Sequence, residues 1–177
     1  MKTEKQLYNE ISNLVKISFL NNGRYKYLSY TLKDSIQDDE DIKIICSGKY
    51  QNKQLEILST NKRIIMVNTG IMPERNEISI EKIDSMQLES KGLFIALHIN
   101  VGATKFIIEN LSNYQEFMNI VNEQMNNYKS FKIEINKTVE KDITDKIERL
   151  AELYKEGILT EYEFATKKME LLESLKK

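Results

Sequence analysis

Apolar residues in the first 37 positions recur at steps of three and four, which is the spacing of one helix face. Two such groups are present, and the turn-forming sequence Asn21-Asn22-Gly23 separates them. The first group is Leu7, Ile11, Leu14 and Val15, and the second is Tyr27, Leu28, Leu32 and Ile36. The pattern therefore predicts two helices joined by a turn.

Between Ile42 and Ile108 apolar and polar residues alternate, and the runs are rich in Ile, Val and Thr. Turn residues such as Gly48, Asn61 and Gly102 divide this region. Seven short strands are predicted, at 42–47, 54–59, 63–68, 76–80, 83–89, 93–99 and 103–108. Consecutive short strands with tight turns favour an antiparallel sandwich or barrel over a parallel sheet.

A helix is predicted to follow the last strand. The capping-box pattern Ser112-x-x-Gln115 marks its start. Its apolar stripe consists of Tyr114, Phe117, Met118, Val121 and Met125. This helix would pack against the strands and close the region.

Residues 127–142 lack a clear helical period. Phe131, Ile133 and Ile135 alternate with polar residues, which fits either an extended piece or a linker. The sequence leaves both alternatives open.

Residues 143–177 have the pattern of a helical hairpin. One stripe consists of Ile143, Ile147, Leu150, Ala151 and Tyr154, and the other of Phe164, Leu171, Leu172 and Leu175. Gly157 stands where a left-handed C-cap residue belongs, and Thr160 with Glu163 forms a capping box for the second helix. Unaided domains become rare below about 40 residues, so this hairpin must bury its stripe against another surface.

Composition and charge exclude several classes of protein. The chain is 41% hydrophobic and 30% charged, which is typical of a globular protein, and it has no apolar run long enough to span a membrane. Its net charge of −1 gives no electrostatic argument for nucleic-acid binding. The polar N-terminus favours a cytoplasmic location. A single cysteine permits no internal disulfide.

The candidate chemical groups favour structural roles. His98 faces away from the apolar stripe of its strand, and Cys46 shares a face with Ile42 and Ile44, where a thiol behaves as a small hydrophobe. The acidic run 38–41 lacks the spacing of a calcium loop, so we expect it to be solvated. Motifs for phosphate or zinc binding do not occur. We therefore expect no enzymatic activity, no metal and no cofactor.

The hairpin resembles a SHOCT domain, the short C-terminal helical hairpin of many bacterial proteins. The matching residues are Leu150, Leu153, Gly157, Ile158, Leu159, Thr160, Glu163, Phe164, Lys167, Leu171 and Leu172. This resemblance implies a role in oligomerisation or protein contacts.

Residues 38–126 resemble bacterial PH-like domains of the YokE-like branch. The resemblance rests on the acidic run 38–41, on the strand entry Thr60-Asn61-Lys62-Arg63, on Ile80-x-x-Ile83 and on the closing helix. It implies an α+β fold, a PH-like seven-stranded antiparallel bent sandwich or barrel capped by a C-terminal helix. N-terminal helices and a C-terminal helical hairpin would flank this domain.

These expectations divide the chain into a helical segment at 1–37, a PH-like domain at 38–126, a linker at 127–142 and a SHOCT-like hairpin at 143–177. We expect a non-enzymatic cytoplasmic binding or scaffold module. It would associate with itself as a homo-oligomer, or with a protein partner, through both domains. The expected interaction residues are Ile71, Met72, Ile147, Leu150, Tyr154, Phe164, Leu171, Leu172 and Leu175.

Two alternatives stay open. Ile71 and Met72 form an apolar pair at a turn tip, which fits either a docking surface or a contact with the N-terminal helices. The segment 1–37 has 6 Lys and Arg against 3 Asp and Glu, so the chain could instead be a peripheral membrane protein. Residues 38–126 have 9 basic against 13 acidic residues, which opposes membrane binding through Lys62 and Arg63.

Overall fold

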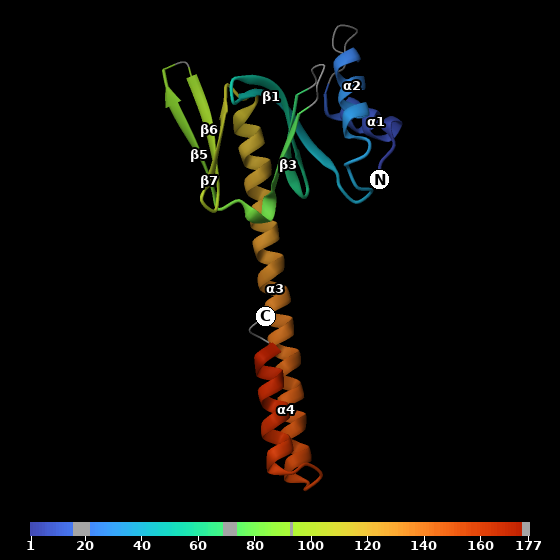
Figure 1. The fold of residues 1–177 in the computed structure, drawn as a ribbon, viewed down its shortest axis with the longest axis vertical. Helices are drawn as coiled ribbons and strands as arrows, with labels where there is room; N and C mark the ends of the chain where they lie inside the picture. The colour runs from blue at the N-terminus through green and yellow to red at the C-terminus, as the bar shows by residue number, and fades with distance from the viewer. Residues whose placement is uncertain (16–21, 69–73, 93, 175–177) are drawn as a thin grey trace. The chain divides into compact units, whose positions relative to one another are not determined.

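The computed structural model describes residues 1–15, 22–68, 74–92 and 94–174 (Figure 1). The chain divides into two compact units, Met1–Asn126 and Asn127–Lys177.

A bent antiparallel sheet forms most of the first unit. Its strands are β1 (Ile42–Tyr50), β2 (Lys53–Thr60), β3 (Arg63–Val67), β4 (Arg75–Ser79), β5 (Ser85–Lys91), β6 (Phe94–Val101) and β7 (Thr104–Glu109). They are ordered β4-β3-β2-β1-β7-β6-β5. β1 pairs with β2 along its length but with β7 only at Lys49 and Tyr50, so the sheet folds over at this point. In the described ranges no ladder joins β4 to β5, so the predicted seven-stranded PH-like fold is confirmed as an unclosed sheet.

The two N-terminal helices cover one face of the first three strands. They are α1 (Glu4–Leu14) and α2 (Asn22–Leu32), as predicted, although Asn22 and Gly23 belong to α2 rather than to the turn before it. Thr3 caps α1 in a reciprocal capping box with Gln6. The buried residues of this layer are Leu7, Ile11, Leu28, Leu32, Ile36, Ile42, Ile45, Leu58, Ile65 and Val67.

The opposite face of these strands forms a second core with β5–β7 and the start of α3 (Tyr114–Lys155). Phe117, Val121 and Met125 enter this core from one face of α3, as predicted. The predicted capping role of Ser112 is wrong, because α3 begins at Tyr114, and the Ser112 hydroxyl instead accepts a hydrogen bond from the backbone N–H of Ser47 at 2.9 Å. Ser112 therefore links α3 to β1 instead of capping the helix.

Residues 127–142 are helical and form the middle of α3, so the expectation of an extended piece is wrong, and their role as a linker between the two domains stays a prediction. The helix contains no Gly or Pro over its 42 residues, and Lys and Glu are good helix formers. The alternation of Phe131, Ile133 and Ile135 misleads because these side chains do not enter a core. They are 61%, 55% and 44% exposed.

The second unit contains the predicted helical hairpin, formed by the end of α3 and by α4 (Glu161–Ser174). Gly157 has a φ of +74° and lies in a Schellman motif. Its N–H donates to Tyr154 O, and the N–H of Ile158 donates to Leu153 O, both at 3.0 Å. The predicted capping box is also present, since the N–H of Glu163 donates to Thr160 Oγ1.

Replacing Gly157 by Ala should destabilise the hairpin by about 1–2 kcal/mol, because a Cβ atom disfavours a positive φ. An added Cβ would meet no atom within 4 Å, so only the backbone conformation contributes. Hydrogen exchange of the α4 amides should accelerate about fivefold or more. The matched control is Gly23→Ala in α2, where the φ is not positive and the Cβ also meets no atom. An unchanged exchange rate in Gly157→Ala would contradict the prediction.

Candidate functional site

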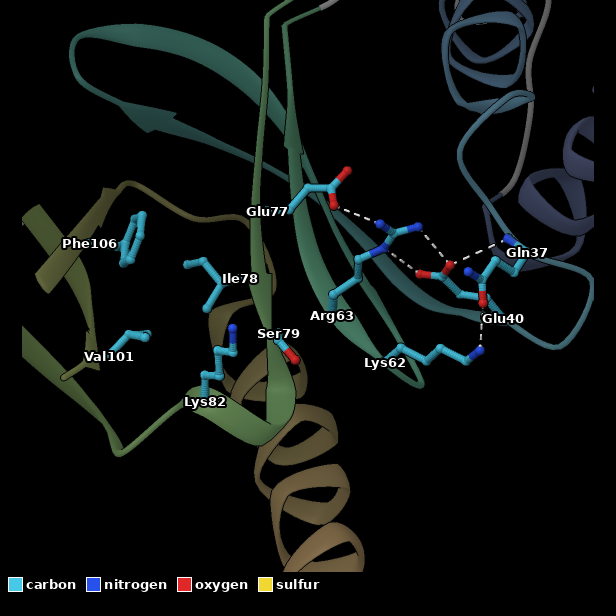
Figure 2. Close-up of a pocket in the computed structure, with 10 residues that line it drawn as sticks. All are labelled: Gln37, Glu40, Lys62, Arg63, Glu77, Ile78, Ser79, Lys82, Val101 and Phe106. Atoms are coloured by element: carbon cyan, nitrogen blue, oxygen red, sulfur yellow. Dashed lines mark hydrogen bonds and ion pairs between the residues drawn. The ribbon is translucent and has the colours of Figure 1, made fainter. Parts of the chain in front are cut away.

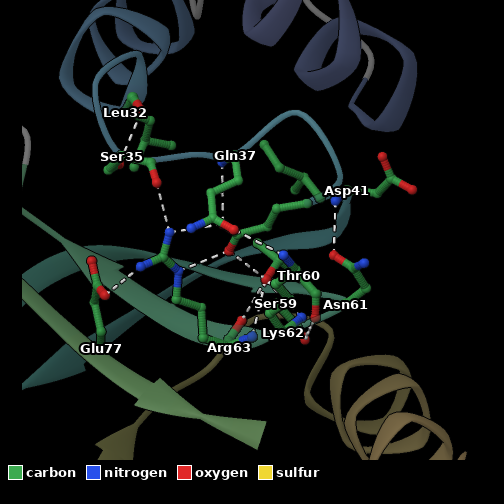
Figure 3. Close-up of polar contacts among 12 residues, drawn as sticks. Leu32, Ser35, Gln37, Asp41, Ser59, Thr60, Asn61, Lys62, Arg63 and Glu77 are labelled. Atoms are coloured by element: carbon green, nitrogen blue, oxygen red, sulfur yellow. Dashed lines mark hydrogen bonds and ion pairs between the residues drawn. The ribbon is translucent and has the colours of Figure 1, made fainter. Parts of the chain in front are cut away.

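The acidic run 38–41 and the turn between β2 and β3 meet in space (Figure 3). Arg63, at the start of β3, binds Glu40 with two parallel hydrogen bonds. Its Nε atom is 2.7 Å from Oε1 of Glu40, and its Nη2 atom is 2.8 Å from Oε2. The Thr60 hydroxyl also donates to Oε1, at 2.9 Å. Glu40 is only 1% exposed, so this bidentate pair neutralises a buried charge.

Arg63 joins two further parts of the first unit. Its Nη1 atom donates to Glu77 Oε2 on β4 at 2.6 Å, and its Nη2 atom donates to the carbonyl of Ser35 at 2.7 Å. Burial alone would raise the pKa of Glu40, but hydrogen bonds from Arg63 and Thr60 and the charge of Arg63 outweigh it and hold the pKa below its usual value. Arg63 is therefore a structural cation.

The other members of the acidic run are also paired. Asp39 accepts a hydrogen bond from Lys62 at 2.7 Å, which lowers the pKa of Asp39. Asp38 pairs with the N-terminal ammonium group at 2.9 Å, and Asp41 pairs with Lys2 at 3.3 Å. Within the described ranges, no group of acidic, His or Cys side chains is arranged to hold a metal ion. The run thus ties the chain before β1 to the β2–β3 turn.

A cavity of about 430 Å³ lies beside this network (Figure 2). Its walls come from β4, from the short helix η1 (Ile80–Lys82) and from β6 and β7, where Val101 and Phe106 contribute apolar surface. Arg63 and Lys62 also line it, but carboxylates already neutralise both. The cavity therefore offers an anionic ligand little free positive charge beyond Lys82.

His98 and Cys46 are both buried. His98 is 8% exposed, and its Nε2 atom lies 3.0 Å from the Glu89 carboxylate. Cys46 is 2% exposed, and burial, with the nearby charge of Glu116, raises the pKa of its thiol to about 12. A thiol with such a pKa is a poor nucleophile near neutral pH.

Most of the predicted apolar stripe of the described N-terminal helices is buried. Leu7, Ile11, Leu28 and Leu32 are 0% exposed, whereas Leu14, Tyr27 and Tyr30 are 42%, 38% and 53% exposed. Arg24 forms an ion pair with the buried carboxylate of Glu56. None of the helices in the described ranges has the length and apolar content needed to cross a membrane.

The interaction residues predicted in the hairpin lie at or beside the contact between α3 and α4. The rings of Tyr154 and Phe164 stack with centroids 5.3 Å apart. Ile147, Leu150, Phe164 and Leu171 are half-buried, and Tyr154 and Leu172 are each 41% exposed. The remaining predicted residues, Ile71, Met72 and Leu175, lie outside the described residues.

A groove of about 420 Å³ runs between α3 and α4 in the second unit. Leu150, Leu153 and Leu171 contribute its apolar surface. The charged and polar residues along it are Lys146, Arg149, Lys167, Glu170 and Ser174. The predicted interaction residues omit Leu153, which is named only among the residues that resemble a SHOCT domain. Leu153 lies three residues after Leu150, and this helical spacing could have identified it as part of the same surface.

More than half of the exposed large hydrophobic side chains of the described chain belong to the second unit. They are Tyr128, Phe131, Ile133, Ile135, Val139, Tyr154, Ile158, Tyr162, Met169 and Leu172. In α4 no described residue is buried. The charged and apolar groups of the first unit are mostly satisfied internally, so the second unit is the stronger candidate for binding.

Comparison with known proteins gives two family matches. Residues 36–123 match the model of the bacterial PH domain, and residues 145–172 match the model of the SHOCT, or short C-terminal, domain. Domains of both kinds are generally non-catalytic. A search of curated proteins found no match.

Two solved structures are similar to part of the chain. A DUF1696 family protein with a pleckstrin-homology domain from Shewanella loihica PV-4 is 15% identical, with a TM-score of 0.43, and the match covers 55% of this chain and 93% of that one. A pleckstrin homology domain from Shewanella amazonensis SB2B is 16% identical, with a TM-score of 0.44, and the match covers 55% and 95%. The resemblance drawn from the residues is confirmed by the family matches: the chain contains a bacterial PH domain followed by a SHOCT domain.

Proposed function

We propose that this chain is a non-enzymatic scaffold protein that associates with a second copy of itself through the hairpin unit. The observation that carries the proposal is the exposure of apolar side chains in that unit, where Ile158 and Met169 are 63% and 62% exposed. A two-helix hairpin has too little interior to bury such residues by itself. Self-association is a common way to bury them.

Basic side chains of the first unit are already paired with carboxylates, which supports this assignment. Arg63, Lys62 and Arg24 are engaged with Glu40, Asp39 and Glu56. Recognition of an anionic membrane needs basic groups that are free to contact the lipid headgroups. The PH domain would therefore act as a rigid body that the hairpin unit brings together with another copy.

Light scattering on the full chain tests the proposal. We expect the wild-type mass to be a multiple of 20.8 kDa at high micromolar concentration. Replacing Leu150 and Leu171 by Asp places two charges in the groove and should weaken association at least about tenfold in Kd. The matched control is Tyr162→Asp, a substitution on α4 at a position that is 80% exposed and outside the groove lining.

The control should associate as the wild type does. A wild-type chain that is monomeric at high micromolar concentration would overturn the proposed self-association. Equal loss of association in Tyr162→Asp and in the groove variant would place the contact outside the groove. Circular dichroism of each variant separates loss of association from loss of helix.

A further inference from the structure

One face of α3 carries exposed apolar residues before the hairpin begins. Phe131, Ile135 and Val139 follow one another at steps of four, which places them on the same side of the helix. They are 61%, 44% and 44% exposed. This segment of α3 precedes residues 145–172, which match the SHOCT model.

The same face continues into the groove of the hairpin. Leu153 follows Ile135 by about five full turns at 3.6 residues per turn, so the two side chains lie in line along α3. Leu153 lines the groove together with Leu150 and with Leu171 of α4. Between the two apolar stretches, Lys146 and Asp142 form an ion pair at 2.6 Å. Apolar surface is therefore available at both ends of this face.

The two sides of the face carry opposite charge. With about 100° of rotation per residue, three acidic residues fall on one side and two lysines on the other, where a lysine of α4 also lines the groove. The acidic side holds Glu134, Asp145 and Glu152, and the basic side holds Lys129, Lys132 and Lys167. Lys141 and Arg149 on the acidic side, and Glu140 and Glu170 on the basic side, are exceptions. All six residues that define the two sides are exposed.

This arrangement of charge distinguishes the two ways in which two copies can pair. A two-fold axis parallel to α3 brings the acidic side of one copy opposite the basic side of the other. An antiparallel pair instead brings the acidic side opposite the acidic side. Opposite charges across an interface fix orientation and register, and like charges disfavour the wrong arrangement.

We propose that a second copy of this chain packs along this face, with the two α3 helices parallel and in register from Phe131 to Leu153. The inference rests on the proposed function and adds the surface and the orientation. It places Ile135 against Ile135 of the partner subunit and Leu153 against Leu153 of the partner subunit. Such a pair is closed by its two-fold symmetry.

Disulfide trapping in the full chain tests the orientation. Phe131→Cys and Leu153→Cys would each be placed close to the same residue of the second copy only in a parallel, in-register pair. An antiparallel pair can bring at most one of these positions next to its own copy. The matched control is Ile133→Cys, on the same helix and 55% exposed but on the opposite face. Diamide would oxidise the paired thiols, and the linked dimers would be read on a non-reducing gel.

We expect both test variants to form the linked dimer about a hundredfold faster than Ile133→Cys, since pairing raises the local thiol concentration to the millimolar range. The wild-type chain should not link, because Cys46 is 2% exposed and burial raises its thiol pKa to about 12. A dimeric mass with linking at only one position, or at neither, would overturn the parallel pairing and leave the proposed function standing. A monomeric mass would overturn both.

Discussion

Replacing Arg63 by Met should lower the free energy of unfolding by about 3 kcal/mol or more. The substitution leaves the Glu40 carboxylate 1% exposed without the guanidinium that neutralises it. It also removes the hydrogen bonds to Glu77 and to the carbonyl of Ser35. The aliphatic part of Met retains much of the packing of the Arg stem. Urea denaturation of the full chain measures the change.

The matched control is Lys62→Met in the same turn. Lys62 pairs with Asp39, whose side chain is 75% exposed, so this pair should contribute less than about 1 kcal/mol. Combining Arg63→Met with Glu40→Gln should recover part of the loss, since no buried charge is then left alone. Equal effects of Arg63→Met and Lys62→Met would show that the Arg63 network is not a buried ion pair.

The Arg63 network shows what the sequence could and could not predict. The sequence indicated the acidic run and the strand entry at Arg63 separately. It did not indicate that the two bind each other. Glu40 precedes β1, whereas Arg63 begins β3, and the pairing of β1 with β2 and of β2 with β3 brings them together. Local patterns do not encode such long-range pairing. For the same reason the run was expected to be solvated.

The helical segments show a second limit. The apolar steps in α1 and α2 predicted most of the buried residues, because these faces lie on a sheet, although Leu14 and Tyr27 are 42% and 38% exposed. The apolar residues of 127–142 are exposed, so their spacing does not follow the period of a buried helix face. Helix continuity there follows from the absence of Gly and Pro in α3. Alternation over three residues left the segment open, and the absence of a helix breaker is the feature that favours a helix there.

The hairpin was predicted in the most detail because its signals are local. Gly157, Thr160 and Glu163 act within one or two turns of the residues they cap, and the structure has each in its predicted role. The groove was not predicted, because it depends on how α3 and α4 face each other. Leu153 and Lys167 line it from different helices. Capping interactions within one or two turns can thus be predicted from the sequence, whereas the groove between the two helices cannot.

Replacing Phe117 by Ala should lower the free energy of unfolding by about 3–5 kcal/mol. Phe117 is 0% exposed and lies in the first turns of α3, in the core cluster that also contains Ile57 of β2 and Ile108 of β7. Its ring belongs to the core between the two halves of the bent sheet, so its removal leaves a cavity that the strands cannot fill without losing their pairing. Hydrogen exchange of the β2 amides reports the loss directly.

Phe94→Ala makes the same chemical change at a position that is 70% exposed, and it should cost less than about 0.5 kcal/mol. Loss of protection in β2 and β7 together would show that Phe117 stabilises both halves of the sheet. If Phe117→Ala cost no more than Phe94→Ala, α3 would not be part of the PH core, and the closing role of this helix would have to be abandoned.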